Sequence, residues 1–156
     1  MILRDARLDE RAALEDLQRR ASLMWDDDRP FLLANPDVIE LPLAHIQSGF
    51  VRVAGEVALG FSVLLPRDGV ALLEGLFVAP GHWRRGIGRA LVEDAAVRAR
   101  AAGLGAVEVV ANHNALGFYE TLGFVVTGLA QTQFGPARRL RRGLGSGQKA
   151  GLLPET

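Results

Sequence analysis

The chain has 156 residues, of which 49% are hydrophobic and 23% charged; its formal net charge at pH 7 is zero, and it contains no cysteine. This length predicts one domain with a core of its own. The lack of cysteine excludes a disulfide framework, a thiolate metal centre and a cysteine nucleophile. A neutral charge balance argues against a broad nucleic-acid-binding surface. Three scattered histidines give no basis for a metal site, so we expect no metal.

Localisation follows from two stretches of the sequence. The uncharged apolar run Val57–Leu65 is too short to cross a bilayer. The opening residues Met1-Ile-Leu-Arg-Asp5 lack the basic and then apolar layout of a signal peptide. We therefore expect a cytoplasmic protein that binds neither membranes nor nucleic acid.

The first third of the chain predicts a short strand and two helices. Residues 2–4 form the strand. Residues 9–24 form an amphipathic helix because their apolar positions recur at a spacing of three and four: Ala13, Leu14, Leu17, Ala21 and Met24. A second short helix is expected over residues 31–34, and Asn35-Pro36-Asp37 is a turn signal.

The rest of the chain alternates between strands, turns and helices. Gly55-Glu56 predicts a hairpin turn between its flanking strands, and residues 66–69 predict a second turn. Further strands are expected at 49–54, 58–65, 70–78, 106–111, 124–127 and 132–140, and helices at 86–102 and 115–122. This order, β-α-α-β-β-β-α-β-α-β-β, favours an α+β fold with a mixed, mostly antiparallel central sheet flanked by helices. We expect a single domain over residues 1–140 and a flexible tail over 141–156.

The segment Leu76–Val92 contains the clearest functional signal. An apolar strand ends there, the chain turns, and Gly86-Ile87-Gly88 opens a helix. The free N–H groups at a helix start suit a phosphate or pyrophosphate, and glycines let the backbone approach it closely. Neighbouring arginines add positive charge: Arg84, Arg85 and Arg89.

Two familiar phosphate loops do not match this segment. Gly81 and Gly86 have P-loop spacing, but Ile87-Gly88 follows them in place of Lys-Ser/Thr. The dinucleotide pattern requires a third glycine where Leu91 stands. A plain turn with a glycine-rich helix start remains the alternative on physical grounds alone.

A second segment, Glu108–Phe124, contains one acid in an apolar strand, then Asn112, then a short helix with Tyr119. The two segments in this order resemble the GNAT-type N-acetyltransferases, over roughly Leu72–Phe124. In that family the first segment binds the pyrophosphate of acetyl-CoA, with the pattern Arg/Gln, two residues, Gly, one residue, Gly/Ala. Trp83 stands at the leading Arg/Gln position, and Arg84 stands where glycine is common.

The resemblance implies transfer of an acetyl group from acetyl-CoA to a primary amine of a small molecule or peptide. It implies these cofactor-binding residues: Leu76, Phe77, Val78, Arg84, Arg85, Gly86, Ile87, Gly88, Arg89, Asn112 and Tyr119. Asn112 has a second reading as a helix N-cap. An acyl-CoA-binding sensor or regulatory module on the same fold is the alternative function, and Trp83 favours it.

The resemblance also indicates catalytic residues. Tyr119 is the candidate acid for the leaving thiolate, with a core aromatic as the alternative. Glu74 and Glu108 are the candidate bases, since each is a lone acid in an apolar strand where desolvation raises a carboxyl pKa. Each acid has an alternative role as the structural partner of an arginine, and a water relay is a third route. Without cysteine we expect direct attack in a ternary complex.

The resemblance implies that acceptor selection comes from the N-terminal half. Trp25 and Phe31 are candidate substrate-binding residues, with Asp26, Asp27 and Asp28 as an attraction for a cationic amine. A solvated acidic turn is the alternative. The protein is expected to be a monomer or a homodimer.

Overall fold

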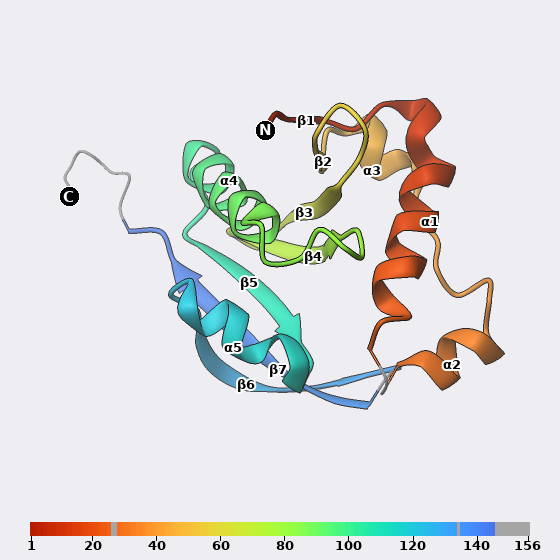
Figure 1. Ribbon diagram of the computed structural model, residues 1–156. Helices are drawn as coiled ribbons and strands as arrows, with labels where there is room; N and C mark the ends of the chain where they lie inside the picture. Colours follow the sequence, from red (N-terminus) through yellow and green to blue (C-terminus); the bar gives the residue numbers. More distant parts are fainter. Residues whose placement is uncertain (26–27, 134, 146–156) are drawn as a thin grey trace. The chain divides into compact units, whose positions relative to one another are not determined.

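The computed structural model describes residues 1–25, 28–133 and 135–145. Figure 1 shows its helices and strands. The helices are η1 (Leu8–Glu10), α1 (Arg11–Ser22), α2 (Arg29–Ala34), α3 (Leu43–Gln47), α4 (Ile87–Ala101) and α5 (His113–Thr121). The strands are β1 (Leu3–Asp5), β2 (Val51–Ala54), β3 (Gly60–Arg67), β4 (Val70–Val78), β5 (Ala106–Ala111), β6 (Val125–Thr132) and β7 (Gly135–Gly143). The expected order is confirmed, with η1 and α3 added to it.

The strands form one seven-stranded sheet in the order β1-β2-β3-β4-β5-β7-β6. β4 and β5 pair in parallel. The pairs β1–β2, β2–β3, β5–β7 and β6–β7 are antiparallel. The prediction of an α+β fold with a mixed, mostly antiparallel sheet is therefore confirmed.

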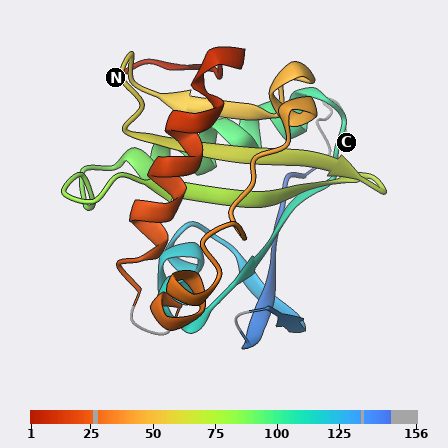
Figure 2. The same cartoon turned by 90° about the vertical axis from the view of Figure 1, so that its right-hand side faces the viewer.

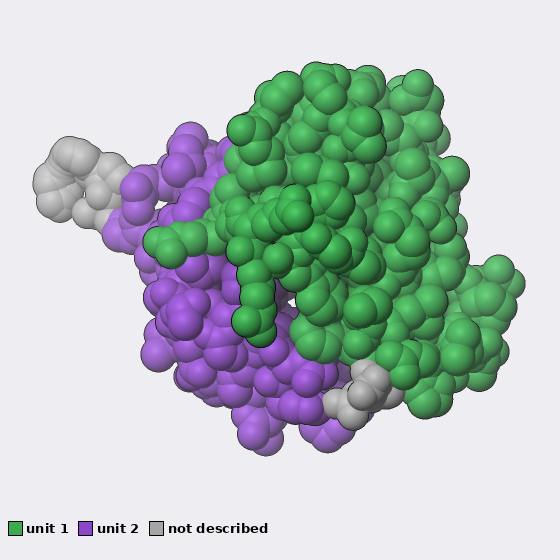
Figure 3. Space-filling model, viewed as in Figure 1, with its two compact units in different colours: residues 1–63, 75–91 green, residues 64–74, 92–156 purple. Residues whose placement is uncertain are grey.

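The chain divides into two compact units, which Figure 3 colours separately. Unit 1 comprises residues 1–63 and 75–91, and unit 2 comprises residues 64–74 and 92–156. β3 and β4 contribute residues to both. The single domain over residues 1–140 stays a prediction.

In unit 1, helix α1 lies across one face of β2 and β3 (Figure 2). Its buried residues follow the expected helical spacing: Leu14, Leu17 and Ala21. The start of α4 packs in the same unit, where Ile87 and Leu91 form a cluster with Ala54. The N–H of Ala79 also donates to Leu59 O at 2.8 Å. The loop between β4 and α4 is thus anchored at both ends.

In unit 2, β5 lies between β4 and β7, and the rest of α4 is tied to β7 by a two-bond ion pair. Arg142 Nη1 and Nη2 donate to the Glu93 carboxylate at 2.9 and 3.0 Å. β7 continues through Gly143, and Leu144 is buried, with its N–H donating to Gly105 O at 3.0 Å. Residues 141–145 are therefore folded, so the tail does not begin at residue 141; residues 146–156 lie outside the described part of the chain.

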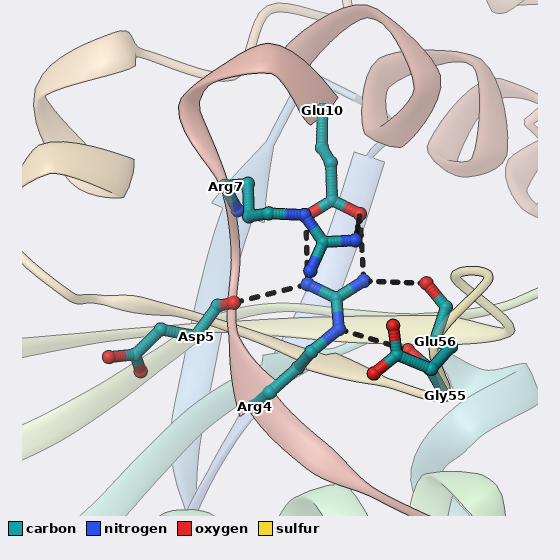
Figure 4. A network of polar contacts seen from close by, with 6 residues as sticks. All are labelled: Arg4, Asp5, Arg7, Glu10, Gly55 and Glu56. Carbon is teal, nitrogen blue, oxygen red and sulfur yellow. Dashed lines mark hydrogen bonds and ion pairs between the residues drawn. The ribbon is translucent and has the colours of Figure 1, made fainter.

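A network of hydrogen bonds and ion pairs connects β1 to η1 in unit 1 (Figure 4). The Arg4 guanidinium donates to both Glu10 carboxylate oxygens at 2.9 and 2.8 Å, and to the carbonyls of Gly55 and Glu56. The Arg7 backbone N–H donates to Glu10 Oε1 at 2.8 Å. The hydrogen bonds from Arg4, followed by the backbone bond from Arg7, lower the pKa of Glu10 to about 2.

We expect Glu10→Gln to destabilise the protein at neutral pH by about 1–3 kcal/mol, because it removes a half-buried charge-assisted pair. A carboxyl with a lowered folded-state pKa stabilises the fold above its unfolded pKa, and this stability is lost as the pH falls. The wild type should therefore lose stability from about pH 4.5 toward about pH 2. Chemical denaturation across that range should show a flatter pH dependence in the variant. Glu40→Gln is the control, since Glu40 pairs with Arg11 at 3.5 Å in an exposed position; equal pH profiles for Glu10→Gln and wild type would contradict the assignment.

Candidate functional site

The loop that follows β4 alternates between negative and positive φ angles. Gly81, Arg84 and Gly86 have φ values of 87°, 64° and 81°, while Arg85 between the last two does not enter the positive region. Alternation of this kind turns successive backbone N–H groups toward one concave side and creates an anion-binding nest. Arg84, Arg85 and Gly86 are all exposed. The structure therefore presents this loop to solvent.

The start of α4 continues the same surface. The N–H of Ala90 donates to Gly86 O at 2.9 Å, in the i to i−4 pattern of a helix. The preceding amides, those of Ile87, Gly88 and Arg89, have no intrahelical acceptor and carry the positive end of the helix dipole. A Cβ built on Gly86 meets no atom within 4 Å, so space beside the backbone is open. The predicted residues 84–89 thus lie together, and their chemistry fits a pyrophosphate.

Arg84 has a φ of 64°, a conformation that glycine adopts more readily than arginine does. A left-handed backbone costs a residue with a Cβ about 1–2 kcal/mol, which glycine avoids. We expect Arg84→Gly to be about 1 kcal/mol more stable than Arg85→Gly, since residue 85 has an ordinary φ and gains only flexibility. Thermal and denaturant unfolding of both variants measure the difference. Equal stabilities would show that residue 84 stores no backbone strain.

Trp83 makes two specific contacts, with β4 and with Trp25. Its indole Nε1–H donates to Val78 O, the last residue of β4, at 2.9 Å. Its ring stacks on Trp25, with a centroid distance of 5.3 Å and an interplanar angle of 18°. Both contacts lie within unit 1, and sequence reasoning missed them. A single sequence carries no signal that pairs residues so far apart.

The other acceptor candidates also belong to unit 1. Phe31 lies in α2 and is half-buried. Asp28 is buried, so it is not part of a solvated acidic turn. Asp26 and Asp27 lie outside the described residues. Trp25 and Phe31 stay predictions for acceptor binding.

The candidate pantetheine strand is β4. Its register with β5 covers three residue pairs, from Ala71↔Val107 to Leu73↔Val109. The backbone of Leu76, Phe77 and Val78 takes no part in that pairing. Those residues stay predictions for cofactor binding, and one carbonyl of the three already accepts the Trp83 indole.

Tyr119 lies in α5, in unit 2. It is 6% exposed, and its ring packs edge-on against Phe118 and Phe124 at centroid distances of 5.1 and 5.4 Å. Burial raises the pKa of the Tyr119 hydroxyl, so the group keeps its proton throughout the neutral range. Tyr119 is therefore a core aromatic, which was the alternative to a catalytic role. A catalytic role for its hydroxyl stays a prediction.

Asn112 is the N-cap of α5. Its Oδ1 accepts hydrogen bonds from the N–H groups of Asn114 and Ala115 at 3.0 and 3.2 Å. The capping interpretation is thereby confirmed. The Nδ2 group is not used in the cap, so contact with a pantetheine arm stays a prediction.

The two candidate bases share one face of the sheet in unit 2. Leu72 is the register partner of Glu108, and Glu74 follows Leu72 by two residues on the same face. Glu74 is exposed, which contradicts the expected desolvation in its strand. Glu108 is 41% exposed and pairs with Arg141 Nη1 at 2.8 Å, as its alternative role anticipated. Among the described residues, Glu74 has no hydrogen-bond or ion-pair partner.

The described residues contain neither a membrane-spanning helix nor a cluster of metal ligands. No helix within residues 1–25, 28–133 and 135–145 is both long and apolar enough to cross a bilayer. Over the same residues, no group of three or more His, Asp or Glu side chains has the arrangement of a metal site.

Comparison with known proteins identifies the family and agrees with the fold. The sequence matches the Acetyltransferase (GNAT) family over residues 11–124. The fold resembles the PaiA N-acetyltransferase of Thermoplasma acidophilum in complex with coenzyme A, with a TM-score of 0.73 and 17% identity over 91% of this chain and 98% of that one. The fold also resembles YncA of Salmonella typhimurium, a putative acetyltransferase with its cofactor acetyl-CoA. The TM-score is 0.70, and the sequence identity is 22% over 99% of this chain and 98% of that one. A third similar structure is an aminoglycoside 6′-N-acetyltransferase complexed with coenzyme A. Its TM-score is 0.69, and the sequence identity is 17% over 92% of this chain and 97% of that one.

Members of this family are acyltransferases that use acetyl-CoA. The match covers well over half of the 156 residues and includes both segments singled out above. The chain belongs to the acetyltransferase (GNAT) family.

Proposed function

We propose that the protein transfers the acetyl group of acetyl-CoA to a primary amine of a small molecule or peptide, by direct attack in a ternary complex. The observation that carries the proposal is the exposed turn of residues 84–86, with its alternating φ angles, followed by the free amides at the start of α4, in a chain of this family. Acetyl-CoA supplies the activated acyl group as a thioester. The absence of cysteine from the sequence removes an acetyl-cysteine route.

The loop residues hold the pyrophosphate. The amides of Gly86, Ile87, Gly88 and Arg89 donate to phosphate oxygens, and the exposed arginine side chains screen their charge. Leu76, Phe77 and Val78 offer strand backbone to the pantetheine arm. Asn112 adds its free Nδ2 group from the start of α5.

Tyr119 donates a hydrogen bond to the sulfur as the thiolate leaves. Its raised pKa keeps the hydroxyl protonated at neutral pH, so the donor is present in every turnover. The packing of its ring against Phe118 and Phe124 fixes the direction of the hydroxyl.

Glu74 is the preferred base. An amine is protonated at neutral pH and must lose a proton before it can attack. Glu108 would have to give up its 2.8 Å bond with Arg141 to accept that proton, whereas the Glu74 carboxylate is free of such a bond. A water held by Glu74 can carry the proton if the amine does not reach the carboxylate directly.

We expect Glu74→Gln to lower the rate of acetyl transfer and to flatten the acidic limb of the pH–rate profile, because that limb reports protonation of the base. Glu108→Gln is the matched variant on the same sheet face. It should keep the limb and lose at most about 1 kcal/mol of stability, since its ion pair is half-exposed. Loss of the acidic limb in Glu108→Gln would make Glu108 the base in place of Glu74. An unaltered limb in both variants would favour a water chain as the route for the proton.

We assign acceptor binding to Trp25 and Phe31 of unit 1.

Release of free CoA from acetyl-CoA in the presence of a panel of amines tests the whole proposal. Aminoglycosides, polyamines and peptides with free N-termini cover the small-molecule and peptide classes. Amine-dependent CoA release supports an acetyltransferase. Tight CoA binding with no amine-dependent release of free CoA would favour the second candidate, an acyl-CoA-binding sensor. Trp83 at the usual Arg/Gln position favours that candidate. The cytoplasmic location and the monomer or homodimer state stay predictions.

A further inference from the structure

The two tryptophans of the chain form a single stacked pair. The sequence contains only Trp25 and Trp83. Trp25 follows the end of α1, and Trp83 lies in the loop between β4 and α4. Their ring planes are 18° from parallel at a centroid distance of 5.3 Å, which is an offset stack. The loop that carries the predicted pyrophosphate site is therefore in contact with the segment that leads into α2.

Trp83 itself is a poor ligand for a phosphate. An indole has a single donor and no acceptor or charge. That donor is already engaged with Val78 O at 2.9 Å. Whatever Trp83 contributes to cofactor binding must therefore act through the shape of the loop.

The loop needs such support. Arg84 comes directly after Trp83 and has the positive φ that a residue with a Cβ avoids. Backbone strain of this kind persists only where surrounding contacts fix the chain. Trp83 supplies two of these contacts, the hydrogen bond to β4 and the stack on Trp25.

We propose that Trp83 is a positioning residue for the phosphate-binding loop and that Trp25 holds it in place through the stack. The affinity for CoA then depends on a residue of the α1–α2 segment that need not touch the cofactor. This inference rests on the proposed function, since it assumes that the loop binds CoA.

The test uses three variants of the full chain and one control. Trp25→Leu removes the stack and keeps an apolar side chain. Trp25→Phe restores an aromatic partner, and Trp83→Phe keeps the stack but removes the N–H donor. Phe50→Leu is the control, because Phe50 is a half-buried aromatic of unit 1 that contacts His45 instead of the loop.

Calorimetry with CoA should show affinity about 3- to 10-fold weaker in Trp25→Leu, which corresponds to the loss of one aromatic pair. Trp25→Phe should recover most of the loss, and Phe50→Leu should bind as the wild type does. Steady-state kinetics at saturating amine should show a raised KM for acetyl-CoA in Trp25→Leu. A general loss of folding would instead lower the active fraction and leave KM as it was.

Circular dichroism provides a readout that is independent of activity. Two stacked indoles produce an exciton couplet, which the wild type should show and Trp25→Leu should lack. Wild-type CoA affinity in a folded Trp25→Leu that has lost the couplet would overturn the proposal, as would a wild type without the couplet. Should Trp25→Leu fail to fold, wild-type CoA affinity in Trp83→Phe, which lacks the hydrogen bond to Val78 O, would overturn it equally. A wild type that shows the couplet but binds no CoA would refute the proposed function itself.

Discussion

Replacement of Gly86 by valine is expected to weaken CoA binding by about 30-fold or more. Gly86 has a φ of 81°, a conformation that a β-branched residue avoids, so the valine variant must rebuild the loop. The amides of Ile87, Gly88 and Arg89 then lose their common direction. Since a Cβ at Gly86 meets no atom within 4 Å, the effect arises from the backbone and not from a clash within the protein.

Gly103→Val is the matched control for this experiment. Gly103 has a φ of 79° and equally open surroundings, but it follows the far end of α4. Both variants should lose about 1–2 kcal/mol of stability, because both force a left-handed valine. Calorimetry should show a loss of CoA affinity in Gly86→Val alone. The same small loss in both variants would remove the loop from consideration as the pyrophosphate site.

The second large effect concerns turnover. Tyr119→Phe should lower kcat by about 10²–10³-fold, the usual cost of removing one hydrogen-bond donor to a developing negative charge, with the affinity for CoA nearly intact. The hydroxyl acts as charge develops on the departing sulfur, so its loss belongs to the transition state. Single-turnover measurements at saturating acetyl-CoA separate this step from product release.

The ring cluster offers a control for packing. Phe124→Leu loosens the contacts around Tyr119 without removing the hydroxyl, because the Phe124 ring packs edge-on against Tyr119 at 5.4 Å. It should lower stability and keep most of the turnover. A normal rate of chemistry in Tyr119→Phe would leave Tyr119 with the role of a core aromatic.

The strands nearest the site were the most predictable part of the fold. The ranges 70–78 and 106–111 agree with β4 and β5 because each is an apolar run bounded by turn signals. Helix α3 was missed because five residues, Leu43–Gln47, are too few to show a helical period. β7 was predicted to end too early, since its last residues contain arginines that resemble a solvated tail. In the structure Arg141 and Arg142 instead pair with Glu108 and Glu93.

Within the candidate site, the sequence predicts features formed by neighbouring residues but not contacts between residues far apart in the chain. The cap at Asn112 and the glycine turn before α4 follow from short-range chemistry. The exposure of Glu74 was not readable, because strand alternation defines two faces without showing which one is covered. The stack of Trp25 on Trp83 depends on the tertiary fold. The resemblance to the family supplied the acetyl-CoA chemistry, which composition and spacing alone left undecided.

The most direct test of the pyrophosphate site is an amide-resolved NMR titration of the ¹⁵N-labelled protein with CoA. Acetylpantetheine, which lacks the pyrophosphate and the nucleotide, serves as the comparison ligand. We expect the backbone amides of Gly86, Ile87, Gly88 and Arg89 to shift strongly with CoA and weakly with acetylpantetheine. CoA-induced shifts that leave these four amides unchanged and gather elsewhere in the chain would contradict the account.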